Sequence, residues 1–272
     1  MAKFGVDVSE HQGLIDWEKA RHCIDFAILR AGFGKNNIDK QFKRNADACA
    51  KHGIPFGVYW FSYALSPEMA AAEADFVCDA IECYNVQYPV SYDFEYDTVK
   101  NMTLNGVTNT KQLMLQMANA FLNRVEQRGH YAMNYANIDF LNRGFSDILT
   151  KYDAWIANWG VSSPPIRAGI WQYTDCGRID GISGDVDLNL CYKDYPAIIA
   201  QLRSAGEKTP VNTEEKTDRL ERARKRWWEK YNTIADDVLS GKYGNGAARK
   251  TALIEHGYDY ALVQDIVNCK LG

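Results

Sequence analysis

Residues 89–97 read PVSYDFEYD, an apolar and aromatic run that carries three carboxylates toward its end. Similar β-prone runs recur through about the first 200 residues, and helix-like amphipathic stretches at 39–52, 67–84 and 111–128 separate the early ones. This alternation predicts an α/β fold in which helices cover a parallel sheet. The eight expected strands are residues 4–9, 26–32, 55–63, 89–97, 130–136, 152–160, 168–174 and 186–192.

Eight such strands indicate that the sheet closes on itself. The connections shorten after the fifth strand, and little helix is expected between residues 157 and 185. The sequence therefore predicts an irregular eight-stranded, parallel-type (TIM-like) barrel, followed by a small all-α module. Enzymes built on parallel barrels place their chemistry at the C-terminal ends of the strands.

Acidic residues stand near the ends of three expected strands. Asp93 and Glu95 are two residues apart in one strand, so period-two geometry puts both on one side, ~6.6 Å apart along the backbone. Asp7 lies near the end of the first strand, and Asp187 lies on the eighth, which closes the barrel beside the first. Like charges held together raise at least one pKa, which leaves a protonated acid beside an ionised one. Glycoside hydrolysis requires such a combination.

Each acid taken alone also fits a structural role, either capping the next helix or pairing with an arginine. Three strand ends that bring carboxylates to one face favour a catalytic site instead. Aromatic residues make up 12% of the chain, and such rings both fill cores and stack on sugars.

Composition excludes several other functions. The formal charge is −4, and residues 1–205 carry 19 basic against 24 acidic side chains, so nucleic acid is not an expected partner. The five histidines show no HxxxH spacing, and we expect neither a metal site nor a cofactor. We expect no membrane insertion, because no apolar run is long enough. The seven cysteines include no CxxC pair and are expected to be buried free thiols.

The segments around the acids are similar to those of glycoside hydrolase family 25, the muramidases of bacteria and phages. The matching segments are GVDVSEHQG (5–13), YWFSY (59–63), DFEYD (93–97), WIANWG (155–160), IWQYT (170–174) and GDVDLNL (184–190). The resemblance covers roughly residues 4–195 and implies that Glu95 is the proton donor. It implies that Asp93 orients the N-acetyl group of the substrate or stabilises the charged transition state. Asp7 and Asp187 match the further acids of the cleft, with Asp185 as a close neighbour of the latter.

The same resemblance implies a groove lined by aromatic and amide side chains. Strand alternation places some of these in the core instead. HYAMNY at 130–135 departs from the family pattern, so we assign no role to Tyr131 or Asn134. The candidate substrate contacts are Tyr59, Phe61, Tyr63, Asn158, Trp159, Trp171, Gln172 and Tyr173.

The C-terminal part changes in composition. A linker and a charged helix are expected at 206–230, between a catalytic domain at 1–205 and a small module at 231–272. Glycines punctuate three expected helices in that module, at 234–239, 247–255 and 260–268. Residues 235–268 resemble the wall-binding repeat of choline-independent pneumococcal phage lysozymes. The resemblance implies wall contacts at Lys242, Tyr243, Asn245, Arg249 and Tyr258.

The acidic set indicates carboxylate acid catalysis, and the family resemblance implies a peptidoglycan muramidase that cuts the β-1,4 bond between N-acetylmuramic acid and N-acetylglucosamine. Its partner would be the glycan strand of the wall. A hydrolase of chitin-like N-acetylglucosamine polymers and a non-catalytic glycan-binding barrel are the alternatives. The N-terminal MAKFGVDVSEHQG lacks the apolar stretch of a secretion signal. Synthesis in a host cytoplasm, followed by release to the wall, is therefore expected.

Overall fold

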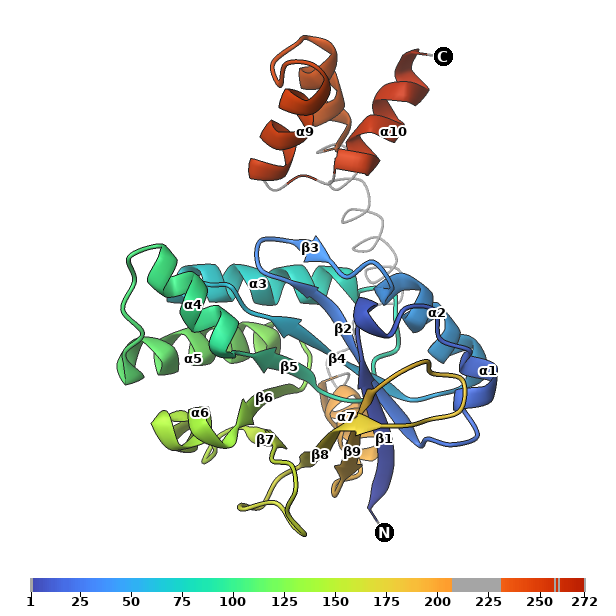
Figure 1. Ribbon diagram of the computed structural model, residues 1–272, viewed down its shortest axis with the longest axis vertical. Coiled ribbons are helices and arrows are strands. Elements are labelled where there is room, and N and C mark those ends of the chain that lie inside the picture. The colour runs from blue at the N-terminus through green and yellow to red at the C-terminus, as the bar shows by residue number, and fades with distance from the viewer. Residues whose placement is uncertain (1, 207–230, 257, 259, 272) are drawn as a thin grey trace. The chain divides into compact units, whose positions relative to one another are not determined.

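The computed structural model of the chain describes residues 2–206, 231–256, 258 and 260–271 (Figure 1). The chain divides into two compact units, Met1–Arg203 and Ser204–Gly272. Of the expected linker and charged helix at 206–230, all but residue 206 lies outside the described residues. The proposed domain boundaries therefore stay predictions, and each unit is described by itself.

Eight strands of the first unit form a closed barrel (Figure 1). The strand order is β1-β9-β8-β7-β6-β5-β4-β2, and the pairing of β1 with β2 closes the ring. The bounds are β1 Lys3–Val8, β2 Phe26–Phe33, β4 Phe56–Phe61, β5 Val90–Asp93, β6 Ala132–Asn137, β7 Asp153–Ala157, β8 Ile170–Gly177 and β9 Val186–Cys191. A two-residue strand, β3 (Asn37–Ile38), adds to the edge of β2 and was not expected.

The predicted barrel is confirmed, but its strands are not all parallel. β9 runs antiparallel to both β1 and β8, whereas the other neighbours in the ring run parallel. The connection between β8 and β9 spans only residues 178–185. A parallel crossover needs a dozen or more residues, so this short connection can only form a hairpin.

The three expected helices are present as α2 (Phe42–His52), α3 (Pro67–Ala80) and α5 (Lys111–Gln127). Ser66 caps α3 by accepting a hydrogen bond from the Met69 backbone N–H, and Pro67 occupies the first helical position. α3 and α5 pack against each other. The remaining elements of the unit are η1 (Glu10–Gln12), α1 (Trp17–Ala20), α4 (Tyr96–Leu104), α6 (Ile138–Arg143), η2 (Phe145–Ile148) and α7 (Tyr195–Gly206).

Strand alternation separates two layers of core. Val6 and Val8 pack in the large cluster that the helices share, while Asp7 between them takes the opposite face of β1. A second, smaller cluster contains Ile28 and Trp155. The barrel interior therefore combines an apolar plug with a set of buried polar side chains, Asp7, Arg30, Asp93, Gln172 and Asn189.

The second half of the barrel is poor in helix, as expected. Between β7 and β9, residues 158–185 contain the strand β8, turns and bends, but no helix. The expectation that the cysteines are buried is correct for half of those described. Cys49, Cys78 and Cys191 are buried, whereas Cys23, Cys83 and Cys176 are exposed. In the described part of the chain, no helix is long and apolar enough to cross a membrane.

The second unit is helical in its described residues. Residues 231–239, α9 (Gly246–Glu255) and α10 (Tyr260–Leu271) match the three expected segments. Gly241 adopts φ +85° in the turn that follows the first helix, a conformation that glycine reaches without steric cost. The helices bury a small apolar core that includes Ile234, Leu253 and Val263.

Candidate active site

Asp7 and Asp187 face each other across the pair of strands β1 and β9. They are register partners, and their carboxyls share a hydrogen bond. Burial raises the pKa of Asp7 to about 6, against hydrogen bonds that stabilise its charge. Burial, and then the charge of Asp7, raise the pKa of Asp187 to about 9. The pair therefore holds one proton at neutral pH.

Asp93 and Glu95 form a second carboxyl pair at the end of β5. Burial, then the charges of Glu95 and Asp7, hold the pKa of Asp93 well above its usual range. The pKa of Glu95 is also raised, mainly by burial, while a hydrogen bond from Tyr135 opposes the shift. Glu95 is half-buried, whereas Asp93 is only 4% exposed. Of the two, Glu95 is thus better placed to meet a substrate.

The expected route by which Asp93 and Glu95 meet is wrong in one respect. β5 ends at Asp93, and Glu95 is the N-cap residue of α4 rather than a strand residue. The backbone N–H of Glu95 donates to Thr98 Oγ1 at 3.1 Å, which fixes the start of the helix. The two carboxyls still share a hydrogen bond, because the chain turns at Phe94. The two pairs also interact electrostatically, since the charge of Asp7 raises the pKa of both Asp93 and Glu95.

Asp185, the close neighbour of Asp187, lies elsewhere. Its carboxylate forms an ion pair with Arg178 at the surface of the β8–β9 hairpin. This arrangement supports Asp187 as the acid of the cleft.

Three buried residues of the site were missed at the sequence level. Tyr135 of β6 is the register partner of Asp93, and its hydroxyl bonds Glu95. Asn189 of β9 donates to Asp7 Oδ2 at 2.8 Å and accepts from Trp155 Nε1 at 2.8 Å. Arg30 of β2 lowers the pKa of Asp93 through its charge. Tyr135 was detectable, because alternation puts it on the same face of its strand as the apolar Met133 of the barrel interior.

Residues excluded from the site at the sequence level lie away from the acids. The Tyr131 hydroxyl donates to Asp153 at 2.8 Å, together with Tyr195 at 2.9 Å. Asn134 is fully buried and donates to the Tyr135 backbone carbonyl.

The candidate groove residues divide into two groups. Gln172 donates to Asp7 Oδ2 at 2.9 Å and accepts from Trp159 Nε1 at 3.2 Å, while the Trp159 ring is 48% exposed. Tyr59 packs edge-to-face on Trp155. Its pKa is raised by burial and then by the charges of Asp7, Asp93 and Asp187. These three residues belong to the acidic end of the barrel.

The remaining groove candidates are less central. Burial, and then the charge of Asp97, raise the pKa of Tyr63, and its ring is tilted against that of Phe61 with the centroids 5.2 Å apart. Trp171 is 5% exposed, and its Nε1 donates to the backbone carbonyl of Asn158. Tyr173 packs against the outer core. Trp171 and Tyr173 therefore serve the framework beside the site, and Asn158 contributes its backbone to it.

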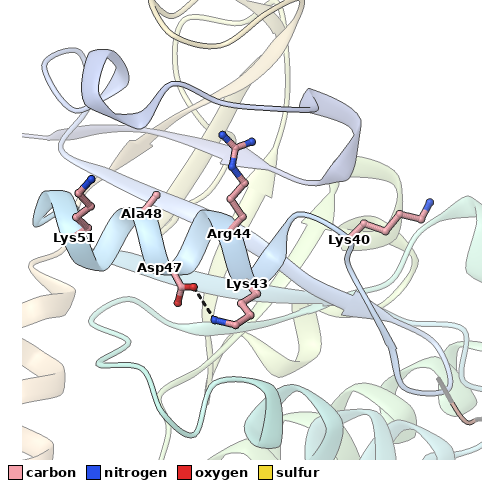
Figure 2. Close-up of a pocket in the computed structure, with 6 residues that line it drawn as sticks. All are labelled: Lys40, Lys43, Arg44, Asp47, Ala48 and Lys51. Atoms are coloured by element: carbon pink, nitrogen blue, oxygen red, sulfur yellow. Dashed lines mark hydrogen bonds and ion pairs between the residues drawn. The ribbon is translucent and has the colours of Figure 1, made fainter. Parts of the chain in front are cut away.

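A separate hollow of about 530 Å³ lies along α2 (Figure 2). Figure 2 shows Arg44 and Lys51 extending to one side of the helix and Lys43 reaching Asp47 on the other. Lys43 donates to Asp47 at 2.7 Å, which lowers the pKa of that carboxyl. A carboxylate held ionised by a lysine is a poor general acid, so this surface does not compete with the barrel end as the catalytic site.

Comparison with known proteins agrees with this geometry. A model of glycosyl hydrolases family 25 matches residues 6–182. The chain belongs to this family. It is thus a glycoside hydrolase, and the family match includes Asp7, Asp93 and Glu95. Asp187 lies beyond the matched residues and is placed at the site by its pairing with Asp7.

Several of the individual relatives are lysozymes. The family 25 barrel is 30% identical over 198 residues to Lysozyme M1 of Streptomyces globisporus, covering 68% of this chain and 66% of the relative. The autolysin LytC of Streptococcus pneumoniae, solved with a synthetic peptidoglycan ligand, has a TM-score of 0.59 and 28% identity, over 70% of this chain and 47% of that one. The lysozyme of Streptococcus phage Cp-7 is 25% identical over 286 residues, covering 97% of this chain and 68% of the relative.

The second unit of this family 25 chain matches the CW_7 repeat at residues 232–271. Among the predicted wall contacts, Lys242 and Asn245 are exposed, and Arg249 is half-buried. Arg249 donates to the Gly244 carbonyl and to Asn245. Tyr243 is a core residue of the unit, with its ring edge-to-face on His256 at 5.6 Å. Tyr258 is partly buried against the same core. The wall-binding roles of these residues stay predictions.

Proposed function

We propose that the barrel hydrolyses the β-1,4 bond between N-acetylmuramic acid and N-acetylglucosamine in peptidoglycan and acts in bacterial cell lysis. The observation that carries the proposal is the pair of carboxyl pairs, Asp7 with Asp187 and Asp93 with Glu95, at one end of the barrel. Raised pKa values in both pairs supply protonated acids beside the ionised Asp7 carboxylate. The lysozymes among the relatives support peptidoglycan as the substrate.

Glu95 acts as the general acid in this proposal. Its carboxyl gives a proton to the glycosidic oxygen while the bond from that oxygen to the anomeric carbon breaks and the bonding electrons go to the oxygen. Positive charge then develops on the sugar ring, and the ionised Asp7 carboxylate stabilises it. The Tyr135 hydroxyl holds Glu95 in place without removing its raised pKa.

Asp93 orients the substrate. Among the described residues, Asp93 Oδ1 is a buried oxygen without a hydrogen-bond partner. Leaving such an acceptor unpaired is costly, and an acetamido N–H of the sugar would satisfy it. Asp7 stays in register with Asp187, and its Oδ2 accepts from both Gln172 and Asn189. This arrangement keeps one negative charge close to the developing cation.

The CW_7 unit binds the wall in this proposal and raises the local concentration of the enzyme at its polymeric substrate. The support is a set of polar side chains on a compact helical core, with Lys242 and Asn245 exposed and Arg249 half-buried. One repeat offers a single contact, so the affinity per molecule would be modest.

Analysis of new reducing ends tests the proposal. Purified bacterial walls are digested, the ends are reduced with borohydride, and the terminal sugars are identified by mass spectrometry. N-acetylmuramic acid at the new ends is expected. N-acetylglucosamine at those ends would indicate a chitin-type specificity. Protein that sediments with walls but creates no new ends would indicate a non-catalytic glycan-binding barrel.

A further inference from the structure

A buried carboxyl on α3 takes no part in the mechanism above. Glu73 is 3% exposed and accepts two hydrogen bonds, from Ser62 Oγ at 2.6 Å and from the Tyr63 backbone N–H at 2.9 Å. Burial raises its pKa to about 7, while both hydrogen bonds stabilise the charged form. A buried acid costs free energy that an apolar residue of similar size would not cost. Packing alone therefore does not explain why an acidic residue stands at position 73.

Ser62 and Tyr63, which donate to Glu73, lie next to the two acidic residues Asp93 of β5 and Glu95 of α4. Ser62, directly after β4, donates through its backbone N–H to the Asp93 carbonyl at 2.8 Å. Its own carbonyl accepts from Thr98 Oγ1 at 2.7 Å. Thr98 Oγ1 in turn accepts from the Glu95 backbone N–H at 3.1 Å. Ser62 is thus hydrogen-bonded to the backbone of Asp93 on one side and, through Thr98, to that of Glu95 on the other.

We infer that Glu73 is a positioning residue, which fixes Ser62 and Tyr63 so that Glu95 is held at hydrogen-bonding distance from Asp93. The inference concerns the role of Glu95 and so depends on the proposed function for its catalytic consequence. Its geometric part does not depend on that function. Glu73 touches neither Asp93 nor Glu95 in any hydrogen bond of the described residues, so it acts only through the backbone of the β4 end.

Two substitutions separate charge from geometry. Glu73→Gln removes the charge but keeps an oxygen for the Tyr63 N–H and a polar atom for Ser62 Oγ. Glu73→Leu removes the same charge and both hydrogen bonds. Any difference between the two variants in the Glu95 pKa or in turnover therefore arises from the lost hydrogen bonds and not from the lost charge. Val77→Ala is the matched control, because Val77 is fully buried one turn further along α3 and is remote from Ser62 in the hydrogen-bond pattern.

The first measurement needs no substrate. The side-chain carboxyl of Glu95 is titrated by carbon-13 NMR in the full-length chain and in each variant. In Glu73→Leu, the pKa of Glu95 is expected to fall toward its ordinary value by about half a unit or more, because Glu95 moves away from its buried site. In Glu73→Gln and Val77→Ala it is expected to stay within about 0.2 unit of the wild type. Equal titration in all four proteins would overturn the inference, whatever bond the enzyme cuts.

The second measurement is turnover on soluble wall fragments. Glu73→Leu is expected to lower kcat at least ~10-fold with KM within about twofold, since small misplacements of a catalytic group act on the reacting geometry. Glu73→Gln is expected to restore kcat to within about threefold of the wild type. An equal fall of kcat in Val77→Ala and Glu73→Leu would mean a purely structural role.

Should Glu73→Leu not fold, Ser62→Ala, which removes the hydroxyl that donates to Glu73, gives the answer. The pKa of Glu95 is expected to fall in Ser62→Ala but not in Val77→Ala, and an unchanged titration in Ser62→Ala would reject the inference.

Discussion

Asp7 of β1 and Asp187 of β9 are register partners in an antiparallel strand pair, and their carboxyls share a hydrogen bond. The reversal of β9 causes this pairing, because it brings a hairpin strand from the far end of the domain alongside the first strand. Gln172 and Asn189 then both donate to Asp7 Oδ2. Asp7 is therefore the better stabilised anion of the pair, and Asp187 carries the proton.

The raised pKa of Asp187 makes stability depend on pH. A carboxyl whose pKa rises from 3.8 to about 9 on folding favours the folded state while it is protonated. This contribution is present below about pH 4 and is lost as pH rises toward about 9. Asp187→Asn should therefore flatten the decline of unfolding free energy between pH 5 and pH 9, measured by chemical denaturation at several pH values. Asp185→Asn, an exposed change on the same hairpin, is the control; an unchanged slope in Asp187→Asn would contradict the assignment.

The Tyr135 hydroxyl forms a hydrogen bond with Glu95, and this bond lowers the pKa of the Glu95 carboxyl. Tyr135→Phe removes that hydroxyl. The Glu95 pKa should rise, so the basic limb of the pH–activity profile should move to higher pH. Turnover should fall by about tenfold, since one hydrogen bond to the general acid is lost. Tyr131→Phe is the matched control, because its hydroxyl bonds Asp153 instead. A profile of Tyr135→Phe that coincides with the wild type would reject a role for this hydroxyl.

Trp159 presents a half-exposed ring beside the acids, fixed by its hydrogen bond to Gln172. Trp159→Ala should raise KM for glycan fragments by about tenfold through loss of stacking. Trp159→Phe keeps a ring but not the N–H and should lie between the two. Steady-state kinetics on soluble fragments decides the matter, and identical KM values for all three proteins would remove Trp159 from the groove.

Arg249→Ala should weaken sedimentation of the protein with intact walls and leave cleavage of soluble fragments unchanged. Lys250→Ala, the neighbouring exposed cation on α9, is the control and should bind walls as the wild type does. Co-sedimentation assays at several protein concentrations measure the effect. Equal binding by both variants would mean that Arg249, which bonds Gly244 and Asn245, only stabilises the fold of the module.

Much of the barrel could be predicted because its strands read as apolar, β-prone runs between helical ones. All eight expected strands are present, and the three clear helices begin and end within a few residues of their predicted bounds. The direction of β9 was missed although the evidence was local. Eight residues between β8 and β9 are too few for a parallel crossover.

The site was predictable in its acids but not in its supporting residues. Asp7, Asp93, Glu95 and Asp187 meet as expected, yet Glu95 does so from a helix N-cap because Phe94 is fully buried in the outer core and the chain turns there. Glu73 and Asn189 act through contacts with segments distant in sequence. A pattern read along one strand or helix cannot reveal such partners.

The central claim is that Glu95 gives the proton that breaks the glycosidic bond. Turnover of Glu95→Gln on purified walls tests it most directly, with Asp97→Asn, an exposed acid two residues away, as the control. The account predicts at least a ~100-fold loss for Glu95→Gln, unchanged sedimentation with walls, and near-normal turnover for Asp97→Asn. Near-normal turnover of Glu95→Gln would contradict it.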